Sequence, residues 1–291
     1  MNYAFHLLIM IEIYTILALS LNLVVGYTGL LSLSHAAFYG LGAYASTLLM
    51  MYFGLNFFPS LAIAVLITAI FSLCIAYSSL KLRGDYFAIS SFAFQVIIFG
   101  ILYNWVGLTR GPYGIAGIPR PCLFGCKVDT LPEFFIFTTI ITGLVIYFKY
   151  SLYKSPFCTI LKAIREEEQA VISMGKNVVR FKILAFVISS GVAAIAGGLY
   201  AGYITYIDPT SFTLDESIFI LAIVLIGGAG NFKGPIVGVL FMLLIPEILR
   251  FVGLPDSIAH NLRQIIYALI LILLARFRPW GIAGDKELGS V

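Results

Sequence analysis

Few side chains within the long apolar runs of this sequence could do acid–base or ion-binding chemistry: Glu12, His35 and Glu247. Burying an ionisable group in apolar surroundings is costly, so each is expected to face other helices or a wet cavity. Glu12 lies in the middle of its run and could serve a transport pathway or pack against a partner subunit. Glu247 follows Pro246 at an expected helix end, which favours an interfacial position.

Sequence motifs for catalysis are missing. No G-x-x-x-x-G-K-[ST] sequence occurs, so the chain has no ATP-binding loop of its own. There is no HExxH motif and no Ser/His/Asp cluster that would indicate an intramembrane enzyme. We therefore expect no catalytic residue, no metal site and no cofactor bound by this chain. The four cysteines lack zinc-type spacing, but Cys122 and Cys126 could pair if their segment faces an oxidising compartment.

Two glycine-rich segments, Leu21 to Ser46 and Ile226 to Gly238, interrupt apolar runs in the two halves of the chain. Unwound backbone at membrane depth survives only where protein or a water-filled cavity satisfies its polar groups. Paired interruptions of this kind indicate a translocation pathway. The alternative is that these glycines serve only close helix packing. The residues predicted to line the pathway are Gly26, Gly29, Ser32, Ser34, His35, Gly40, Gly42, Gly227, Gly228, Gly230 and Gly234. We expect the two breaks to meet near the bilayer midplane.

The segment between Ser155 and Lys182 has the pattern of a surface helix. Ser155 and Pro156 favour a helix start, with the serine side chain as the cap. Apolar residues then recur at helical spacing, which predicts one amphipathic helix over 156–175. Gly175 suits the left-handed residue that ends such a helix, and Asn177 suits the cap of the next.

This surface helix could lie on lipid headgroups or dock to a protein. The run Glu166–Glu168 disfavours an anionic membrane surface, so docking to a protein is favoured. Seven of the 18 Lys and Arg residues fall within 149–182, which places that loop in the cytoplasm and indicates topology, not nucleic-acid binding. The same rule places the Lys81/Arg83 turn and the C-terminal tail inside, and 104–131 outside.

The composition of the chain is that of a membrane protein, so these segments are positioned by a membrane-spanning fold. The 291 residues are 60% hydrophobic and 11% charged, against about 25% charged in soluble domains. The expected fold is all-α and polytopic, a single transmembrane domain over 1–291 with about 8–10 helices, some broken or short, and a cytoplasmic coupling helix. The expected spans are approximately 4–25, 30–50, 58–80, 86–103, 132–149, 183–203, 215–229, 234–251 and 263–276.

Several motifs in order resemble one family. NLVVGYTGLLSLSHAAFYGLGAYAS, RGDYFAIS, GPYGIAGIP, LKAIREEEQAVISMGKN and GGAGNFKGPIVG together resemble the branched-chain amino acid ABC permeases of the LivM type. The resemblance covers most of the chain, from about residue 21 to residue 281. Two departures stand out: Arg110 replaces a common glycine, and Gln169-Ala170-Val171 is a loose form of the loop core.

The resemblance implies partners and a location. They are a sister permease in a heterodimer, two ATPase subunits that bind ATP and Mg²⁺, a periplasmic or extracellular solute-binding protein, and the lipid bilayer. The location would be the bacterial inner membrane, with a cytoplasmic C-terminus. Glu168 to Gly175 looks like the family's ATPase-docking loop. The coupling residues implied are Arg165, Glu167, Glu168, Ala170 and Gly175.

The function implied is that of a passive half of a pump for leucine, isoleucine and valine. Relatives with similar permease sequences carry urea and other small amides, so such a substrate stays an alternative. A rival from another class is a self-sufficient secondary transporter or channel, for which Glu12 and His35 give thin support. Copurification with ATPase subunits would decide between the two classes.

Overall fold

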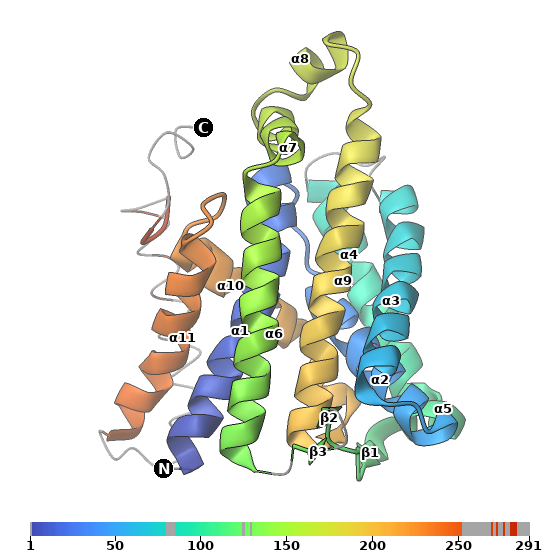
Figure 1. Ribbon diagram of the computed structural model, residues 1–291. Coiled ribbons are helices and arrows are strands. Elements are labelled where there is room, and N and C mark those ends of the chain that lie inside the picture. The colour runs from blue at the N-terminus through green and yellow to red at the C-terminus, as the bar shows by residue number, and fades with distance from the viewer. Residues whose placement is uncertain are drawn as a thin grey trace.

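The structure is a bundle of long helices (Figure 1). This computed structural model describes residues 2–79, 85–123, 126–128, 130–251 and 280–283, with single residues 269, 272 and 276. The main helices are α1 (Asn2–Thr28), α2 (His35–Phe53), α3 (Phe57–Ser79), α4 (Asp85–Asn104), α6 (Leu131–Tyr153), α9 (Val178–Ile204), α10 (Leu214–Gly227) and α11 (Gly234–Phe251). The expected span 263–276 and the Lys81/Arg83 turn lie outside the described residues.

The all-α polytopic membrane fold is confirmed. Within the described ranges, seven helical segments are long and apolar enough to cross a membrane. A shorter apolar helix covers Gly234–Ile245. Helices dominate because apolar runs of about 20 residues can satisfy their backbone groups in lipid only by helical hydrogen bonds.

Helix α9 occupies the middle of the bundle and packs against α1, α2 and α3. Small residues allow the close approach of α2 and α9. A Cβ atom added to Gly42 would lie 2.3 Å from the Ala194 Cα atom, and one added to Gly197 would lie 2.2 Å from the Tyr39 carbonyl oxygen. Both distances are shorter than any van der Waals contact, so the α2–α9 interface requires glycine at these positions.

Helices α2 and α10 both begin inside the bundle. Residues 29–34, which follow α1, are not helical. They lead the chain back along α1, so that α2 begins at His35 beside Ser20. Strand β4 (Tyr206–Ile207) and the 3-10 helix η2 (Pro209–Phe212) return the chain in the same way before α10 begins. The expected span 30–50 therefore loses its first five residues to a non-helical segment.

The end of the bundle that holds the N-terminus carries the irregular segment between α4 and α6 (Figure 1). It contains α5 (Val106–Thr109), η1 (Gly111–Tyr113), β1 (Ile115–Ala116), β2 (Cys122–Leu123) and β3 (Cys126–Lys127). Strand β1 pairs with β4, and β2 pairs with β3 so that Cys122 faces Lys127 and Leu123 faces Cys126. The cysteine side chains lie outside the described residues, so the disulfide stays a prediction.

Arg110, in the same irregular segment, has a left-handed backbone with φ of 59°. Glycine adopts this conformation at little cost, whereas other residues adopt it rarely. This left-handed backbone explains why glycine is common at this position in the family that the chain resembles.

The opposite end carries α7 (Pro156–Glu166) and α8 (Glu168–Ser173) (Figure 1). The expectation of one helix over 156–175 is wrong, because Glu167 adopts an extended backbone, with φ of −149° and ψ of 93°. The expected side-chain cap by Ser155 is also wrong, since its hydroxyl donates to the Leu152 carbonyl oxygen at 2.6 Å. Two details are confirmed: Gly175 is left-handed with φ of 75°, and Asn177 Oδ1 accepts from Arg180 N at 3.1 Å.

Candidate translocation pathway

A buried glutamine on α4 connects the starts of α2 and α10. Gln95 is 1% exposed, and its Oε1 atom accepts from Ala37 N at 2.6 Å and from Ser217 Oγ at 3.2 Å. Its Nε2 atom donates to the Phe212 carbonyl oxygen at 2.8 Å. Ser217 Oγ in turn accepts from Ala36 N at 2.9 Å. The N–H groups of Ala36 and Ala37 at the start of α2 are thus satisfied by side chains of two other helices.

Sequence reasoning missed both Gln95 and Ser217. The available signal was a single uncharged amide inside the apolar run 86–103, where such a group needs partners. Because all its partners are distant in the sequence, the pattern around residue 95 did not identify them.

The predicted residues Ser32, Ser34 and His35 lie together at this centre. Ser32 Oγ and Ser34 Oγ are 3.1 Å apart, and His35 Nε2 lies 2.5 Å from Ser20 Oγ. The Ser20 hydroxyl donates its one proton to the Leu17 carbonyl oxygen at 2.6 Å. His35 Nε2 must therefore be the donor to Ser20, which fixes the tautomer of the imidazole.

The carboxylates within the helices make contacts inside this chain. Thr139 Oγ1 on α6 donates to the Glu12 carboxylate at 2.6 Å, so Glu12 joins α1 to α6. Tyr14 OH donates to Glu216 Oε1 at 2.7 Å in the first turn of α10. Tyr3 OH donates to Glu247, which links the N-terminal end of α1 to α11.

The two glycine-rich breaks meet at Asn22, as expected. Asn22 Oδ1 accepts from Gly230 N at 3.0 Å, and Asn22 Nδ2 donates to the Asn231 carbonyl oxygen at 2.9 Å. A Cβ atom added to Gly26 would lie 2.4 Å from Gly230 N. The position differs from the expected midplane: Arg165 on α7 donates from Nη1 to the Gly26 carbonyl oxygen at 2.6 Å. The junction therefore lies at the end of the bundle that carries α7.

Several predicted pathway glycines have packing contacts. A Cβ atom added to Gly40 would lie 2.9 Å from the Phe212 ring. Added Cβ atoms would lie 2.1 Å from a backbone oxygen both at Gly227, facing Gly234, and at Gly234, facing Gly228. These contacts favour the packing alternative for the α10–α11 glycines, and their role in the pathway stays a prediction.

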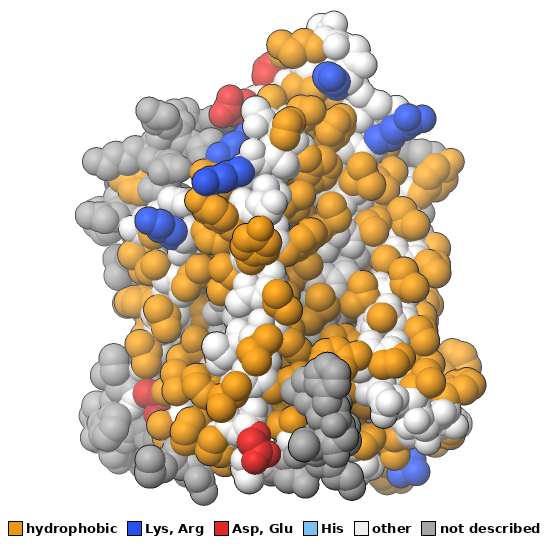
Figure 2. All heavy atoms as spheres, in the orientation of Figure 1, with side chains coloured by type: hydrophobic (Ala, Val, Ile, Leu, Met, Phe, Trp, Pro, Cys, Tyr) orange, Lys and Arg blue, Asp and Glu red, His pale blue; other side chains and the backbone are white. Residues whose placement is uncertain are grey.

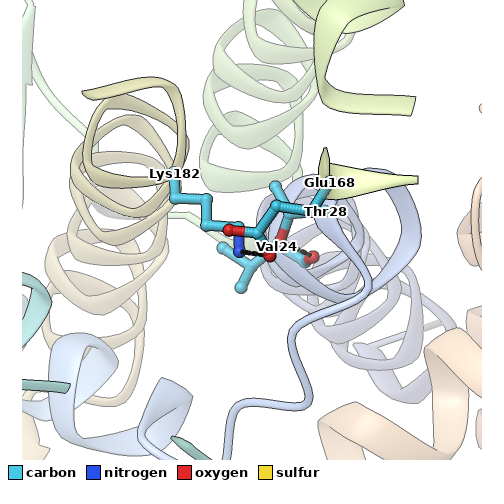
Figure 3. A network of polar contacts seen from close by, with 4 residues as sticks. All are labelled: Val24, Thr28, Glu168 and Lys182. Atoms are coloured by element: carbon cyan, nitrogen blue, oxygen red, sulfur yellow. Dashed lines mark hydrogen bonds and ion pairs between the residues drawn. The ribbon is translucent and has the colours of Figure 1, made fainter. Parts of the chain in front are cut away.

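Helix α8 projects beyond the bundle and is anchored to α9. Lys182 Nζ donates to Glu168 Oε2 at 2.9 Å, in a network that Figure 3 shows beside the last turn of α1. Val171 is buried, whereas Met174 is 76% exposed and Ile172 is 46% exposed. The predicted residues Glu167, Ala170 and Gly175 are also exposed. The tip therefore presents apolar and acidic side chains on a fixed support.

The comparisons with known proteins identify the family. A family described as "Branched-chain amino acid transport system / permease component" matches residues 3–275. The chain belongs to this family. It is 34% identical to the high-affinity branched-chain amino acid transport system permease protein LivM of Salmonella typhimurium, over 94% of this chain and 68% of that protein.

Other relatives extend the comparison. The LivM protein of Escherichia coli is 35% identical over 93% of this chain and 67% of its own length. The guanosine ABC transporter permease protein NupQ of Bacillus subtilis is 27% identical over 69% of this chain and 67% of its own length. No solved structure matches the chain.

Proposed function

We propose that this chain is the membrane-spanning permease subunit of an ATP-driven importer of branched-chain amino acids. The observation that carries the proposal is the projecting α7–α8 unit, which has an exposed apolar tip and a direct bond to the junction of the two breaks. A secondary transporter has no need of such a docking unit. Because no ATP-binding loop is present, ATP and Mg²⁺ are bound by separate ATPase subunits.

The proposed orientation places the α7–α8 end in the cytoplasm. The Lys and Arg excess of 149–182 supports this orientation. The C-terminal segment lies at the same end, because Ile282 N donates to the Ile226 carbonyl oxygen and Ala283 N to the Gly227 carbonyl oxygen, both at 2.9 Å. The two observations together support a cytoplasmic C-terminus.

In the proposed mechanism, movement of α7 and α8 acts on the junction of the two glycine-rich breaks. A solute-binding protein delivers substrate at the end carrying β1–β4, and a sister permease completes the pathway. ATP binding by the ATPases displaces α7 and α8, and Arg165 transmits the displacement to Gly26 and the junction of the breaks. Differential affinity of ATP for the two arrangements of the ATPases must drive the change.

The substrate assignment rests on the relatives named for branched-chain amino acid transport. The guanosine relative indicates that the family fold alone does not fix the substrate.

The test is reconstitution of the purified chain with its copurifying subunits in proteoliposomes. The expected result is uptake of labelled leucine into the vesicles only when ATP is on the side of the ATPase subunits and a solute-binding protein is on the opposite side. Uptake by the chain alone, driven by a sodium or proton gradient, would establish a secondary transporter instead.

A further inference from the structure

A small cavity with a buried lysine lies where α1, α6 and α7 meet. Its lining includes Asn22, Lys149, Tyr153, Cys158 and Phe232, and its volume is about 10 Å³. The Lys149 side chain on α6 is 5% exposed, and Nζ has no hydrogen-bond partner. A buried ammonium group without a partner is strongly disfavoured, so a polar or anionic occupant of this cavity would stabilise the charged form of Lys149.

More lysines surround the cavity at the surface of the bundle. Lys162 Nζ lies 4.8 Å from the ring centroid of Tyr153, a lining residue. Lys154 Nζ lies 4.5 Å from the ring centroid of Tyr150, whose ring is 5.5 Å from that of Phe232. Lys233 follows Phe232 and is exposed. Figure 2 shows basic side chains gathered at this end of the bundle, above a broad hydrophobic belt.

The chain supplies no carboxylate to this cluster among the residues that the structure describes. The ion pair that the described residues form at this end of the bundle joins Lys182 of α9 to Glu168 of α8, and it involves none of these lysines. The amino groups of Lys149, Lys154 and Lys162 therefore have no ion-pair partner among the described residues, and an anion from outside the chain would balance their charge.

The depth of the cluster points to the membrane interface. Helix α6 has 23 residues and ends at Tyr153, so it is about 34 Å long and spans the hydrocarbon core of a bilayer, which is about 30 Å thick. Lys149 and Tyr150 lie in its last two turns, near the boundary between the hydrocarbon core and the headgroups, and Lys154 follows the helix end. Aromatic and basic side chains together are typical of that level.

We propose that this cluster binds the phosphate group of an anionic phospholipid. A cavity of about 10 Å³ holds one water-sized atom, so a single phosphate oxygen fits beside Lys149. The remaining phosphate oxygens and the headgroup then lie near Lys154 and Lys162. Basic pockets between helices at the cytoplasmic face are suited to such headgroups.

The experiment measures which lipids the full chain retains. The chain is placed in nanodiscs of phosphatidylcholine with or without phosphatidylglycerol, released gently, and weighed with its bound lipids by native mass spectrometry. The wild type is expected to retain phosphatidylglycerol over phosphatidylcholine. A Lys154→Gln/Lys162→Gln double variant should retain it about tenfold to thirtyfold less, since each lysine near an anionic surface contributes about fivefold.

The matched control removes two positive charges at the same end of the molecule. A Lys176→Gln/Arg180→Gln variant changes two exposed residues beyond the bundle and should retain phosphatidylglycerol within about twofold of the wild type. Lys149→Met should also lower phosphatidylglycerol retention and leave phosphatidylcholine unchanged. Elution of each variant as a single species in size-exclusion chromatography checks folding.

Three results would overturn the proposal. Equal losses in the two double variants would mean that general surface charge attracts the lipid. Saturable binding of inorganic phosphate in phosphatidylcholine nanodiscs, with no lipid preference, would assign the cavity to a soluble anion. Loss of copurifying ATPase subunits from the Lys154→Gln/Lys162→Gln variant, with lipid retention unchanged, would make these lysines part of a protein interface.

Discussion

Arg165 offers the sharpest test of how the surface helices act on the bundle. Its Nη1 atom donates to the Gly26 carbonyl oxygen at 2.6 Å, in the last turn of α1. The last four carbonyl groups of a helix have no partner within the helix, and a cation there also interacts favourably with the negative end of the helix dipole. Gly29, three residues further on, would place an added Cβ atom 3.1 Å from Arg165 Cγ. The side chain therefore binds α7 to the first break.

The perturbation is Arg165→Met, which keeps the length and removes the donor. Hydrogen bonds to charged groups contribute about 1.5–3 kcal/mol. If the bond transmits the movement of α7, losing about 2 kcal/mol of coupling free energy reduces transport per ATP hydrolysed by about thirtyfold. Arg165→Lys keeps the charge without the planar donor geometry, and an intermediate loss is expected.

The assay measures leucine uptake and ATP hydrolysis in the same proteoliposomes. Hydrolysis should stay within about twofold while uptake falls. Arg180→Met is the control, because Arg180 is exposed at the same end of the bundle. Unchanged uptake by Arg165→Met would refute the reasoning. Loss of bound ATPase from that variant would instead support the ATPase contact that the sequence predicted for Arg165.

Three further predictions concern single residues. Gly42→Val should prevent assembly or lower the melting temperature strongly in detergent, because the α9 backbone lies 2.3 Å from the added Cβ; Gly143→Ala, with nothing within 4 Å, should be neutral. Gly175→Val should permit membrane insertion but reduce ATP-driven uptake, since φ of 75° strains a β-branched residue where space is open; normal uptake would contradict this. Burial raises the pKa of the Cys158 thiol to about 11, so at pH 7.5 maleimide should not label it even in opened membranes, and labelling should rise only as the pH approaches that value. An introduced Ser173→Cys, on the exposed helix α8, is the positive control.

Local patterns in the sequence determined the membrane fold and several helix ends. Apolar runs long enough to span a bilayer specify helices because lipid offers no other partners for backbone groups. Gly175 and Asn177 were predicted correctly because left-handed backbone and N-capping depend on one residue and its neighbours. The meeting of the two glycine-rich breaks was also predicted, from their matching places in the two halves.

Local patterns failed where a side chain had more than one possible partner. Ser155 could cap the next helix or donate backward to Leu152, and it donates backward. The sequence of 156–175 is amphipathic throughout, yet the chain bends at Glu167, where α8 turns to place Glu168 beside Lys182 of α9. This contact between two elements accompanies a break that helical spacing alone did not predict.

Only the tertiary structure decided the depth at which α2 and α10 begin. Gln95 bonds to residues that lie 58 and 122 positions away, at the starts of those two helices. The same holds for Arg165 and Gly26, which are 139 residues apart. Hydrophobic periodicity records which face of a helix is buried, but it contains no information on which buried groups meet. Those pairings depend on the packing of α1, α4 and α9 into one bundle, and they set the positions of the polar groups that any transported molecule would encounter.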